Sequence, residues 1–267
     1  MSSKAIASGS VTLFFQIDSN SSGSRGVGVC VEPGAITQVS KGNFAIFLNG
    51  ERIVGKIQRR IAERLNFKGI IETKVHLPVS QGFGMSAAIA LSTALAIADF
   101  KGIDANIAAI VTHETEIEMG TGLGDVASEL VGGFTYRRTP GIPPTGKIEK
   151  IEYDGLINLV VLGPKIPTNQ IIKEQSWKRK IAELGTEAIA KFERARTWRN
   201  ALNVGREFSF SLGLMSRELR NFLEECKNAT QALLGNSAIV FGSCDEYEGK
   251  MYSVKLGHKA RVGDFQF

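Results

Sequence analysis

A glycine-rich turn between a strand and a long apolar helix constrains this chain more than any other feature of its sequence. Alternating apolar and polar residues predict a strand over Ile70–Leu77, Pro78 ends it, and the segment 79–84 leads into the apolar run Met85–Ala98. Glycines let a backbone approach phosphate oxygens closely, and the following helix presents free N–H groups and the positive end of its dipole. The turn is therefore either a phosphate cradle or a strand-to-helix turn that needs glycine only for its dihedral angles, and its context has to decide.

Two well-known phosphate cradles can be compared with this turn. The P-loop pattern requires a lysine directly after the second glycine, but the first lysine after Gly84 is Lys101, which excludes a P-loop. The dinucleotide fingerprint GxGxxG/A is formally matched by Gly82, Gly84 and Ala87. That fold also needs an acidic residue at the end of a second strand about 20 positions on. Asp104 has the spacing but lies between two predicted helices, so an NAD-dependent oxidoreductase remains only an alternative.

A second glycine-rich turn follows a helix that carries several carboxylates. His113 and Glu116 are three residues apart and share one helical face, and the segment 120–124 delivers Asp125 to the start of a short helix. Phosphoryl transfer needs a hydroxyl and a carboxylate that hold Mg²⁺, and a carboxylate near the acceptor hydroxyl. Ser86, Glu116 and Asp125 can fill these roles. The alternative is structural, with the glutamates on a solvated face, Asp125 as a helix N-cap and His113 as a packing residue.

The rest of the chain predicts two lobes that meet near residue 150, with residues 1–150 in the first lobe and 151–267 in the second. The first lobe is rich in strands and holds both glycine turns, whereas helical patterns dominate the second. Strands are expected over 11–17, 26–31, 44–48, 134–138, 156–162, 237–241 and 251–256, and further helices over 51–67, 105–119, 126–130, 170–183, 187–196, 201–214 and 219–233.

Composition and charge limit the class of protein. With 267 residues, of which 43% are hydrophobic and 22% charged, the chain can build a core and is neither disordered nor fibrous. The longest apolar run is shorter than the ~20 residues of a membrane span, and no secretory signal is recognisable, so we expect a cytoplasmic protein without a membrane partner. Cys30, Cys226 and Cys244 lack CxxC spacing, which predicts neither a disulfide framework nor a zinc site. The net charge of +5 is spread out without interleaved aromatic residues, so no nucleic acid partner is expected.

The first glycine turn and four other stretches carry a family resemblance that spans most of the chain. PVSQGFGMSAA, from Pro78 to Ala88, resembles the PxxxGLGSSAA phosphate loop of the GHMP kinases, the superfamily of galactokinase, homoserine kinase and mevalonate kinase. GSRGVGVC, HETE followed by GTGLGDV, GGFTYRR and QALLGNSAIVF are similar to the archaeal branch that phosphorylates pantoate. The sequence departs from the wider superfamily at Ser8-Gly9, where Pro-Gly is usual, at Met85 in place of serine, and in a C-terminal loop with fewer glycines.

The resemblance implies an α+β fold, a two-lobed α/β sandwich of the GHMP kinase type with the active site in the cleft between the lobes. It also implies Mg²⁺- and ATP-dependent phosphorylation of the 4-hydroxyl of (R)-pantoate, giving 4-phosphopantoate and ADP in coenzyme A biosynthesis, and a homodimer. Met85 and the C-terminal loop are what the pantoate-phosphorylating branch would show, so they favour it over a mevalonate- or homoserine-type kinase, which stays an alternative. The basic charge leaves a non-catalytic RNA-binding protein as a second alternative.

The roles of individual residues follow from the same resemblance. Pantoate has a carboxylate that an arginine can bind through two hydrogen bonds, and hydroxyls that serine and histidine can orient. The matching positions are Gly82, Phe83, Gly84, Met85, Ser86 and Ala87 for ATP phosphates, Ser86 and Glu116 for magnesium, Asp125 for catalysis, and Ser24, His113 and Arg137 for pantoate.

Overall fold

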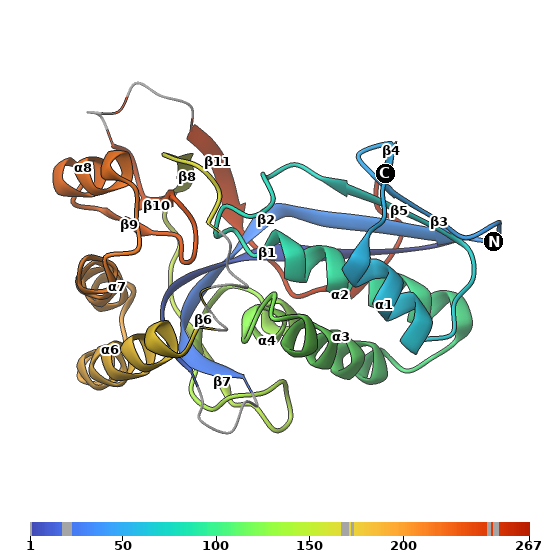
Figure 1. Cartoon of the computed structure of the whole chain (residues 1–267), viewed down its shortest axis with the longest axis horizontal. Helices are drawn as coiled ribbons and strands as arrows, with labels where there is room; N and C mark the ends of the chain where they lie inside the picture. The colour runs from blue at the N-terminus through green and yellow to red at the C-terminus, as the bar shows by residue number, and fades with distance from the viewer. Residues whose placement is uncertain (1, 18–22, 167–170, 172–173, 245–246, 248–250) are drawn as a thin grey trace.

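Two long antiparallel strands, β1 (Ser2–Ile17) and β2 (Ser24–Ser40), form the central axis of the computed structural model (Figure 1), which describes residues 2–17, 23–166, 171, 174–244, 247 and 251–267. They pair along their whole length, from Ser2 opposite Ser40 to Ile17 opposite Ser24. The sequence predicts the first of these strands only from Val11, because the preceding residues are mostly serine, alanine and glycine. Their small side chains let the backbone lie close to α2 (Met85–Lys101): a Cβ at Gly9 would lie 2.5 Å from the carbonyl oxygen of Phe83.

The remaining strands extend this pair into one mixed sheet. Its main path runs β4-β3-β5-β2-β11-β8-β10-β9, while β1 pairs with β2 and β12, and β6 pairs with β2 and β7. All pairs are antiparallel except β3 with β5. Together with the helices, this mixed sheet confirms the predicted α+β class. The bounds are β3 (Ala45–Leu48), β4 (Glu51–Arg52), β5 (Ile70–Val75), β6 (Phe134–Arg137), β7 (Ile148–Ile151), β8 (Ile157–Val161), β9 (Ala229–Gln231), β10 (Ser237–Phe241), β11 (Met251–Leu256) and β12 (Arg261–Val262).

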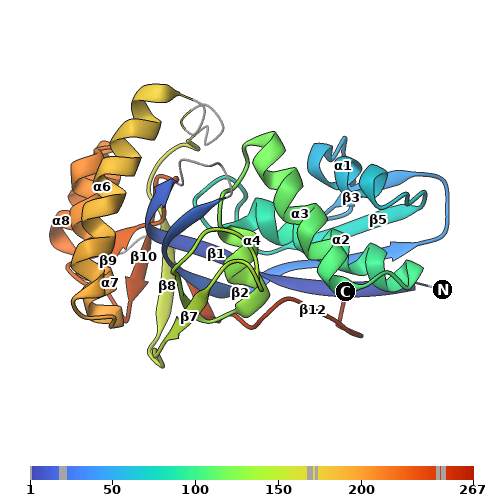
Figure 2. The same ribbon diagram turned by 90° about the horizontal axis from the view of Figure 1, so that it is seen from below.

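The helices gather at the two ends of the molecule. Helix α2 is apolar on all sides and buried, because it lies between the β1–β2 pair and the helices α1 and α3. At the opposite end, α6, α7 and α8 lie beside β9 and β10, and Figure 2 shows the same separation from below. No helix in the described part of the chain has the length and hydropathy needed to cross a membrane. The bounds are α1 (Lys56–Arg64), α3 (Ala105–Met119), α4 (Asp125–Val131), α6 (Gln175–Glu193), α7 (Trp198–Leu212) and α8 (Arg217–Glu225).

Three helix predictions in the second half of the chain differ from the structure. The expected pair 170–183 and 187–196 is the single helix α6 where the structure describes it, and Gly185 lies inside it. This glycine allows a close approach to β1, since a Cβ there would lie 2.4 Å from the carbonyl oxygen of Phe15. The expected helix 219–233 ends at Glu225, after which β9 pairs with β10. Short apolar runs such as this one do not distinguish a buried strand from a helix.

The end of the chain returns to the first half of the sheet. Strand β11 pairs with β8 and also with β2, where Leu256 lies opposite Val31. Strand β12 pairs with β1, and the Lys4 ammonium lies 3.1 Å from the Asp264 carboxylate. Residues 251–264 therefore join elements of the predicted first lobe, and a division of the chain near residue 150 stays a prediction.

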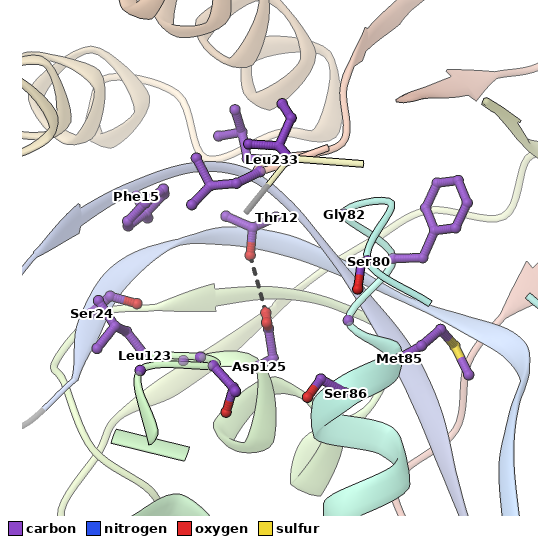
Figure 3. Close-up of a pocket in the computed structure, with 18 of the residues that line it drawn as sticks. Thr12, Phe15, Ser24, Ser80, Gly82, Met85, Ser86, Leu123, Asp125 and Leu233 are labelled. Carbon is purple, nitrogen blue, oxygen red and sulfur yellow. Dashed lines mark hydrogen bonds between the residues drawn. The ribbon is translucent and has the colours of Figure 1, made fainter. Parts of the chain in front are cut away.

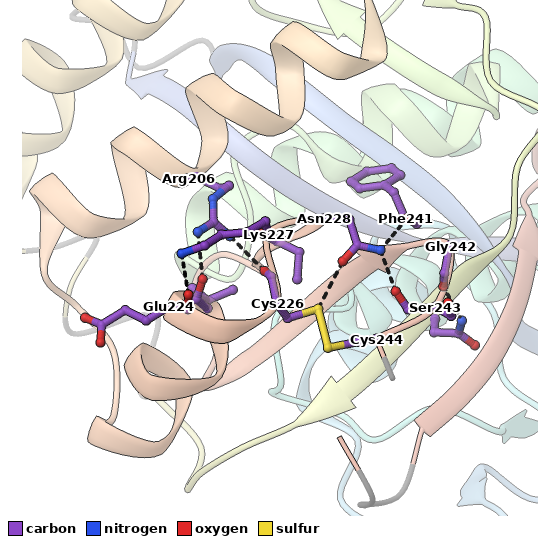
Figure 4. The surroundings of a disulfide bond; sticks show 12 residues. Arg206, Glu224, Cys226, Lys227, Asn228, Phe241, Gly242, Ser243 and Cys244 are labelled. Atoms are coloured by element: carbon purple, nitrogen blue, oxygen red, sulfur yellow. Dashed lines mark hydrogen bonds between the residues drawn. A yellow bond between two sulfur atoms is a disulfide. The ribbon is translucent and has the colours of Figure 1, made fainter. Parts of the chain in front are cut away.

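One pair of cysteines differs from the sequence prediction. Cys226 and Cys244, 18 residues apart, are joined by a disulfide in the structure (Figure 4), which the sequence analysis does not predict. Their spacing gives no hint of this, because β9 and β10 form the hairpin that brings the two Cα atoms within 5.9 Å. Nearby, the side-chain amide of Asn228 donates to the carbonyl oxygen of Phe241 at 2.9 Å. Cys30 is a buried free thiol.

Candidate active site

A cavity of about 470 Å³ lies where β1, α2 and the 119–125 turn meet (Figure 3). Its wall includes Thr12 and Phe15 from β1, the 82–86 loop and the start of α4. Ile166, Leu233 and Leu234 also line it, so both halves of the sequence contribute to one cavity. Two cationic side chains, Lys56 and Arg137, are among the described lining residues.

The first glycine turn has a backbone that only small residues allow. Ser80, Gly82 and Gly84 have φ angles of 67°, 77° and 67°, which lie in the left-handed region. A Cβ at Gly84 would lie 2.4 Å from the amide nitrogen of Ser10, which in turn donates to the carbonyl oxygen of Phe83 at 3.0 Å. Among the described residues, no side chain caps the N-terminus of α2, so its first amides can bind an anion at the cavity.

Asp125 is the first residue of α4 and faces the cavity. Its Oδ1 accepts a hydrogen bond from the Thr12 hydroxyl at 3.3 Å, and Figure 3 shows the two side chains pointing toward one another. Burial raises the pKa of Asp125 above its usual range, whereas the positive charge of Arg137 and the bond from Thr12 act against this rise. The carboxyl group thus has the higher proton affinity that suits a proton acceptor near neutral pH.

Glu116 lies behind the second glycine turn and does not reach the cavity wall. Its side chain is buried, and Oε1 accepts a hydrogen bond from the Thr121 hydroxyl at 2.8 Å. The turn backbone lies directly against the carboxylate, because a Cβ at Gly122 would be 2.3 Å from Oε2. Burial, reinforced by the nearby charge of Asp125, raises the pKa of Glu116 to about 8.

A third carboxyl group, which the sequence does not single out, belongs to the same buried region. Glu129 follows Asp125 by one turn of α4, is 0% exposed, and has no hydrogen-bond partner for either carboxyl oxygen among the described residues. Its pKa is raised well above the usual range, first by burial and then by Asp125 and Glu116. Ionisation of any one of these three carboxyl groups therefore makes ionisation of the other two less favourable.

Arg137 provides the positive charge that acts on Asp125. Only 2% of this residue is exposed, yet it lines the cavity, and its Nη1 donates to the Ser128 hydroxyl at 2.9 Å. Its Nε has no hydrogen-bond partner among the described residues. A Cβ at Gly124 would lie 2.5 Å from this Nε and 2.6 Å from the Ser24 hydroxyl oxygen. The Gly124 backbone thus seats both side chains at the cavity, which suits an anionic ligand.

The structure brings most of the predicted site residues together. Ser24, Asp125, Arg137 and the loop from Gly82 to Ser86 all line the cavity. Ala87 is buried in α2 and Glu116 lies behind the turn, so neither lines it. His113 is also outside the lining, although its Cε1 lies 3.6 Å from the position of a Cβ at Gly23, next to Ser24.

Several lining residues carry no recognisable sequence signal. Thr12 lies in a strand whose pattern is simply apolar, and Lys56 is an ordinary charged residue at the start of an amphipathic helix. Leu233 ends the expected helix 219–233, and the only stretch singled out in the sequence that includes both Leu233 and Leu234 is QALLGNSAIVF, which carries the family resemblance. Ser80 does have a usable signal, because it precedes the first glycine turn, and so do the lining residues 120–124 of the second.

The geometry combines three chemical capabilities. Free amides and glycine backbone at the 82–86 loop can bind phosphate oxygens. Arg137 can pair with a carboxylate, and Asp125 between them can accept a proton from a hydroxyl group. A cavity of this kind can align an anionic alcohol with a terminal phosphoryl group.

Comparisons with known proteins agree with this chemistry. The family described as GHMP kinases N terminal domain matches residues 52–133. A pantoate kinase of Methanocaldococcus jannaschii is 30% identical over 261 residues, covering 93% of this chain and 96% of that protein. A pantoate kinase of Thermococcus kodakarensis is 30% identical over 217 residues, covering 76% of this chain and 72% of the other.

Solved structures share the fold. A phosphotransferase related to the CoA biosynthesis pathway has a TM-score of 0.82 at 24% identity, with 98% of this chain and 99% of that one covered. The Methanococcus jannaschii mevalonate kinase has a TM-score of 0.66 at 13% identity, with 96% and 98% covered. The predicted GHMP kinase fold is thereby confirmed, and by its sequence likeness along nearly the whole length of the Methanocaldococcus jannaschii enzyme the chain belongs to the pantoate kinase family.

Proposed function

We propose that this protein transfers the γ-phosphoryl group of ATP to the 4-hydroxyl of (R)-pantoate. The observation that carries this proposal is the buried Arg137, whose Nε lacks a partner among the described residues and which lines the same cavity as the glycine loop and Asp125. Pantoate offers a carboxylate for this arginine and a hydroxyl for this aspartate. The relatives named pantoate kinase support the same substrate.

The reaction requires the acceptor and the nucleotide to lie in line. In our mechanism, the amides of the 82–86 loop and of the first turn of α2 bind the nucleotide phosphates. Arg137 and Ser24 bind the acceptor, and His113 lies beside Gly23, the residue before Ser24. The acceptor oxygen forms a bond to the γ-phosphorus while the bond to the bridging oxygen breaks and ADP leaves. The hydroxyl proton passes to the Asp125 carboxylate, whose pKa burial has raised.

The residues near the phosphate loop fit a magnesium ion that is held mainly by the nucleotide. Mg²⁺ usually takes one or two protein carboxylates and completes its shell with phosphate oxygens and water. Ser86 lines the cavity with its hydroxyl, and Glu116 lies directly behind the thin wall formed by Gly122. When bound, the ion neutralises phosphate charge. Ser86 is the cavity-lining residue of this chain that would hold it, and Glu116 would join it only if the turn at Gly122 moved aside.

The direct test is ADP release from Mg-ATP with a panel of acceptors: pantoate, pantothenate, mevalonate, homoserine and none. We expect release with pantoate alone. Asp125→Asn should lower kcat by about 10² to 10⁴-fold, the usual contribution of a positioned proton acceptor. Asp154→Asn, at an exposed loop position, is the matched control and should leave kcat unchanged. Turnover with mevalonate or homoserine instead of pantoate would reject the substrate, and full activity of Asp125→Asn would reject the role of that residue.

Other properties stay predictions from the sequence and the family resemblance. A site in the cleft between two lobes is supported by a cavity whose wall comes from both halves of the sequence. A homodimer, a cytoplasmic location and the absence of nucleic acid partners stay predictions.

A further inference from the structure

The residue just before the first glycine of the phosphate loop reaches across to the other half of the chain. Gln81 is buried, and its Oε1 accepts a hydrogen bond from the Ser237 hydroxyl at 3.0 Å, across 156 residues of sequence. Its Nε2 donates to the carbonyl oxygen of Gly163 at 3.3 Å. Gln81 is not among the residues that line the cavity. Its side chain therefore contacts the support of the loop and does not face a ligand.

The backbones of the two segments also touch. A Cβ at Gly82 would lie 2.2 Å from the carbonyl oxygen of Ala232, and a Cβ at Gly235 would lie 2.3 Å from the carbonyl oxygen of Gln81. The contact thus fixes how close the phosphate loop lies to the segment 232–237. Neither glycine can accept a side chain without moving the other segment.

The receiving segment is itself held by buried polar side chains. The Gln231 amide donates to the carbonyl oxygens of Leu214 at 2.6 Å and of Gly235 at 2.9 Å. The Asn236 amide donates to the carbonyl oxygen of Pro164 at 2.8 Å, and its Oδ1 accepts from the Ser216 amide at 2.6 Å. Segment 232–237 is consequently a firm support, because Asn236 and the preceding Gln231 tie it to two other parts of the second half of the chain, at Pro164 and at residues 214–216.

The phosphate loop needs such a support. Three of its residues, Ser80, Gly82 and Gly84, alternate through left-handed backbone angles, a conformation that the surrounding structure has to maintain. On one side the loop is fixed by the Ser10 amide, which donates to the carbonyl oxygen of Phe83. On the other side, the side-chain hydrogen bonds to the second half of the chain come from Gln81.

We propose that Gln81 is a positioning residue for nucleotide binding, which fixes the phosphate loop against segment 232–237 through Ser237 and Gly163. This inference rests on the proposed function only in taking the loop as the ATP site. Phosphate binding depends on several amides pointing at one anion, so a displaced loop loses affinity for nucleotide. Pantoate binding depends on Arg137 and Ser24, which Gln81 does not touch.

The test substitutes Gln81→Leu, which keeps the approximate size and removes both hydrogen bonds. A misplacement of 1 Å in a binding site can reduce function about 10²-fold, so we expect the ADP dissociation constant and the ATP KM to rise about tenfold or more. The pantoate KM should change less than twofold. ADP binding is measured by calorimetry without any acceptor, so its result does not depend on whether pantoate is the substrate.

Two further variants keep the test decisive if Gln81→Leu folds poorly. Ser237→Ala removes only one of the two hydrogen bonds and should raise the ADP dissociation constant by a smaller factor. The double variant Gln81→Leu/Ser237→Ala should bind ADP no more weakly than Gln81→Leu alone. Asn158→Leu is the matched control, because Asn158 donates to the carbonyl oxygen of Gly242 at 2.7 Å in the same half of the chain, away from the loop. It should lower the Tm and leave ADP binding unchanged.

Three results would overturn the proposal. One is unchanged ADP binding in both Gln81→Leu and Ser237→Ala. Another is an equal rise of the ATP and pantoate KM values, which would indicate a general loosening of the fold. The third is a loss of ADP binding in Asn158→Leu as large as that in Gln81→Leu. If ADP binding weakens as expected but pantoate is not phosphorylated, the positioning role stands and only the acceptor assignment fails.

Discussion

Replacement of Glu116 by glutamine should make the protein without ligands more stable at alkaline pH. The Glu116 carboxyl is 1% exposed and has a pKa of about 8, against an ordinary value of 4.5, because it is buried and lies near Asp125. A carboxyl whose pKa is higher in the folded state favours folding while it is protonated. That stability is fully present below pH 4.5 and is lost as the pH rises through about 8. Glutamine keeps the shape of the side chain and cannot ionise.

The size of the effect follows from the two pKa values. The difference between about 8 and 4.5, at 1.36 kcal/mol per pH unit, gives about 5 kcal/mol over the whole range. About 3 kcal/mol of this should fall between about pH 6 and pH 9, because part of the loss already occurs below that range. The stability advantage of Glu116→Gln over the natural protein should grow by that amount as the pH rises.

The assay is urea unfolding in the absence of Mg²⁺ and nucleotide, at intervals from acid to alkaline pH. Glu114→Gln is the matched control, because the Glu114 side chain is 59% exposed on the same helix. The difference in unfolding free energy between this variant and the natural protein should change by no more than about 0.5 kcal/mol across the pH range. If the unfolding free energies of Glu116→Gln and the natural protein remain parallel from acid to alkaline pH, Glu116 is not a buried neutral acid and the reasoning is refuted.

Two further predictions concern the acceptor side of the cavity. Arg137→Ala should raise the pantoate KM by about tenfold or more, the usual loss for a hydrogen bond to a charged group. It should also shift the acid limb of the kcat profile to higher pH, because Arg137 lowers the pKa of Asp125. Arg138→Ala, at an exposed residue paired with Glu149, should change neither quantity, and an unaltered pantoate KM in Arg137→Ala would remove Arg137 from the acceptor site. Gly124→Ala should raise the pantoate KM with the ATP KM unchanged, since its methyl group would meet the Arg137 guanidinium, and steady-state kinetics with each substrate varied would expose the opposite pattern.

Sequence reasoning identifies the parts of the site that have local signatures. The 82–86 loop and Asp125 are found because each belongs to a glycine-rich turn directly before a helix, a pattern that can be read from neighbouring residues. Thr12 is missed because it reaches the cavity through long-range pairing, with Leu233 as its partner, which leaves no mark on nearby residues. The expected helix over 219–233 fails for the same reason, since β9 exists only through its pairing with β10.

Helix α6 shows a different limit. Gly185 interrupts a helical pattern, and a glycine in that position predicts a break. In the structure the missing side chain serves the close approach of the helix to β1, so the residue reports a tertiary contact and not a local bend. A single sequence cannot separate these two uses of glycine.

The pairing of β12 with β1 has a consequence for how the chain is made. Strand β1 is synthesised long before its partner around Val262. Closing such a long loop costs little more entropy than closing a shorter one, about 0.6 kcal/mol for each doubling of length. The pairing of β12 with β1 is therefore delayed by the order of synthesis and not by the free energy of loop closure. Until then β1 has an open edge next to Ala5, which is the kind of strand edge that other chains can join. A circularly permuted chain that links the segment after β12 to the start of β1, beside the Lys4–Asp264 ion pair, and opens at the 140–146 loop should complete this edge earlier in synthesis.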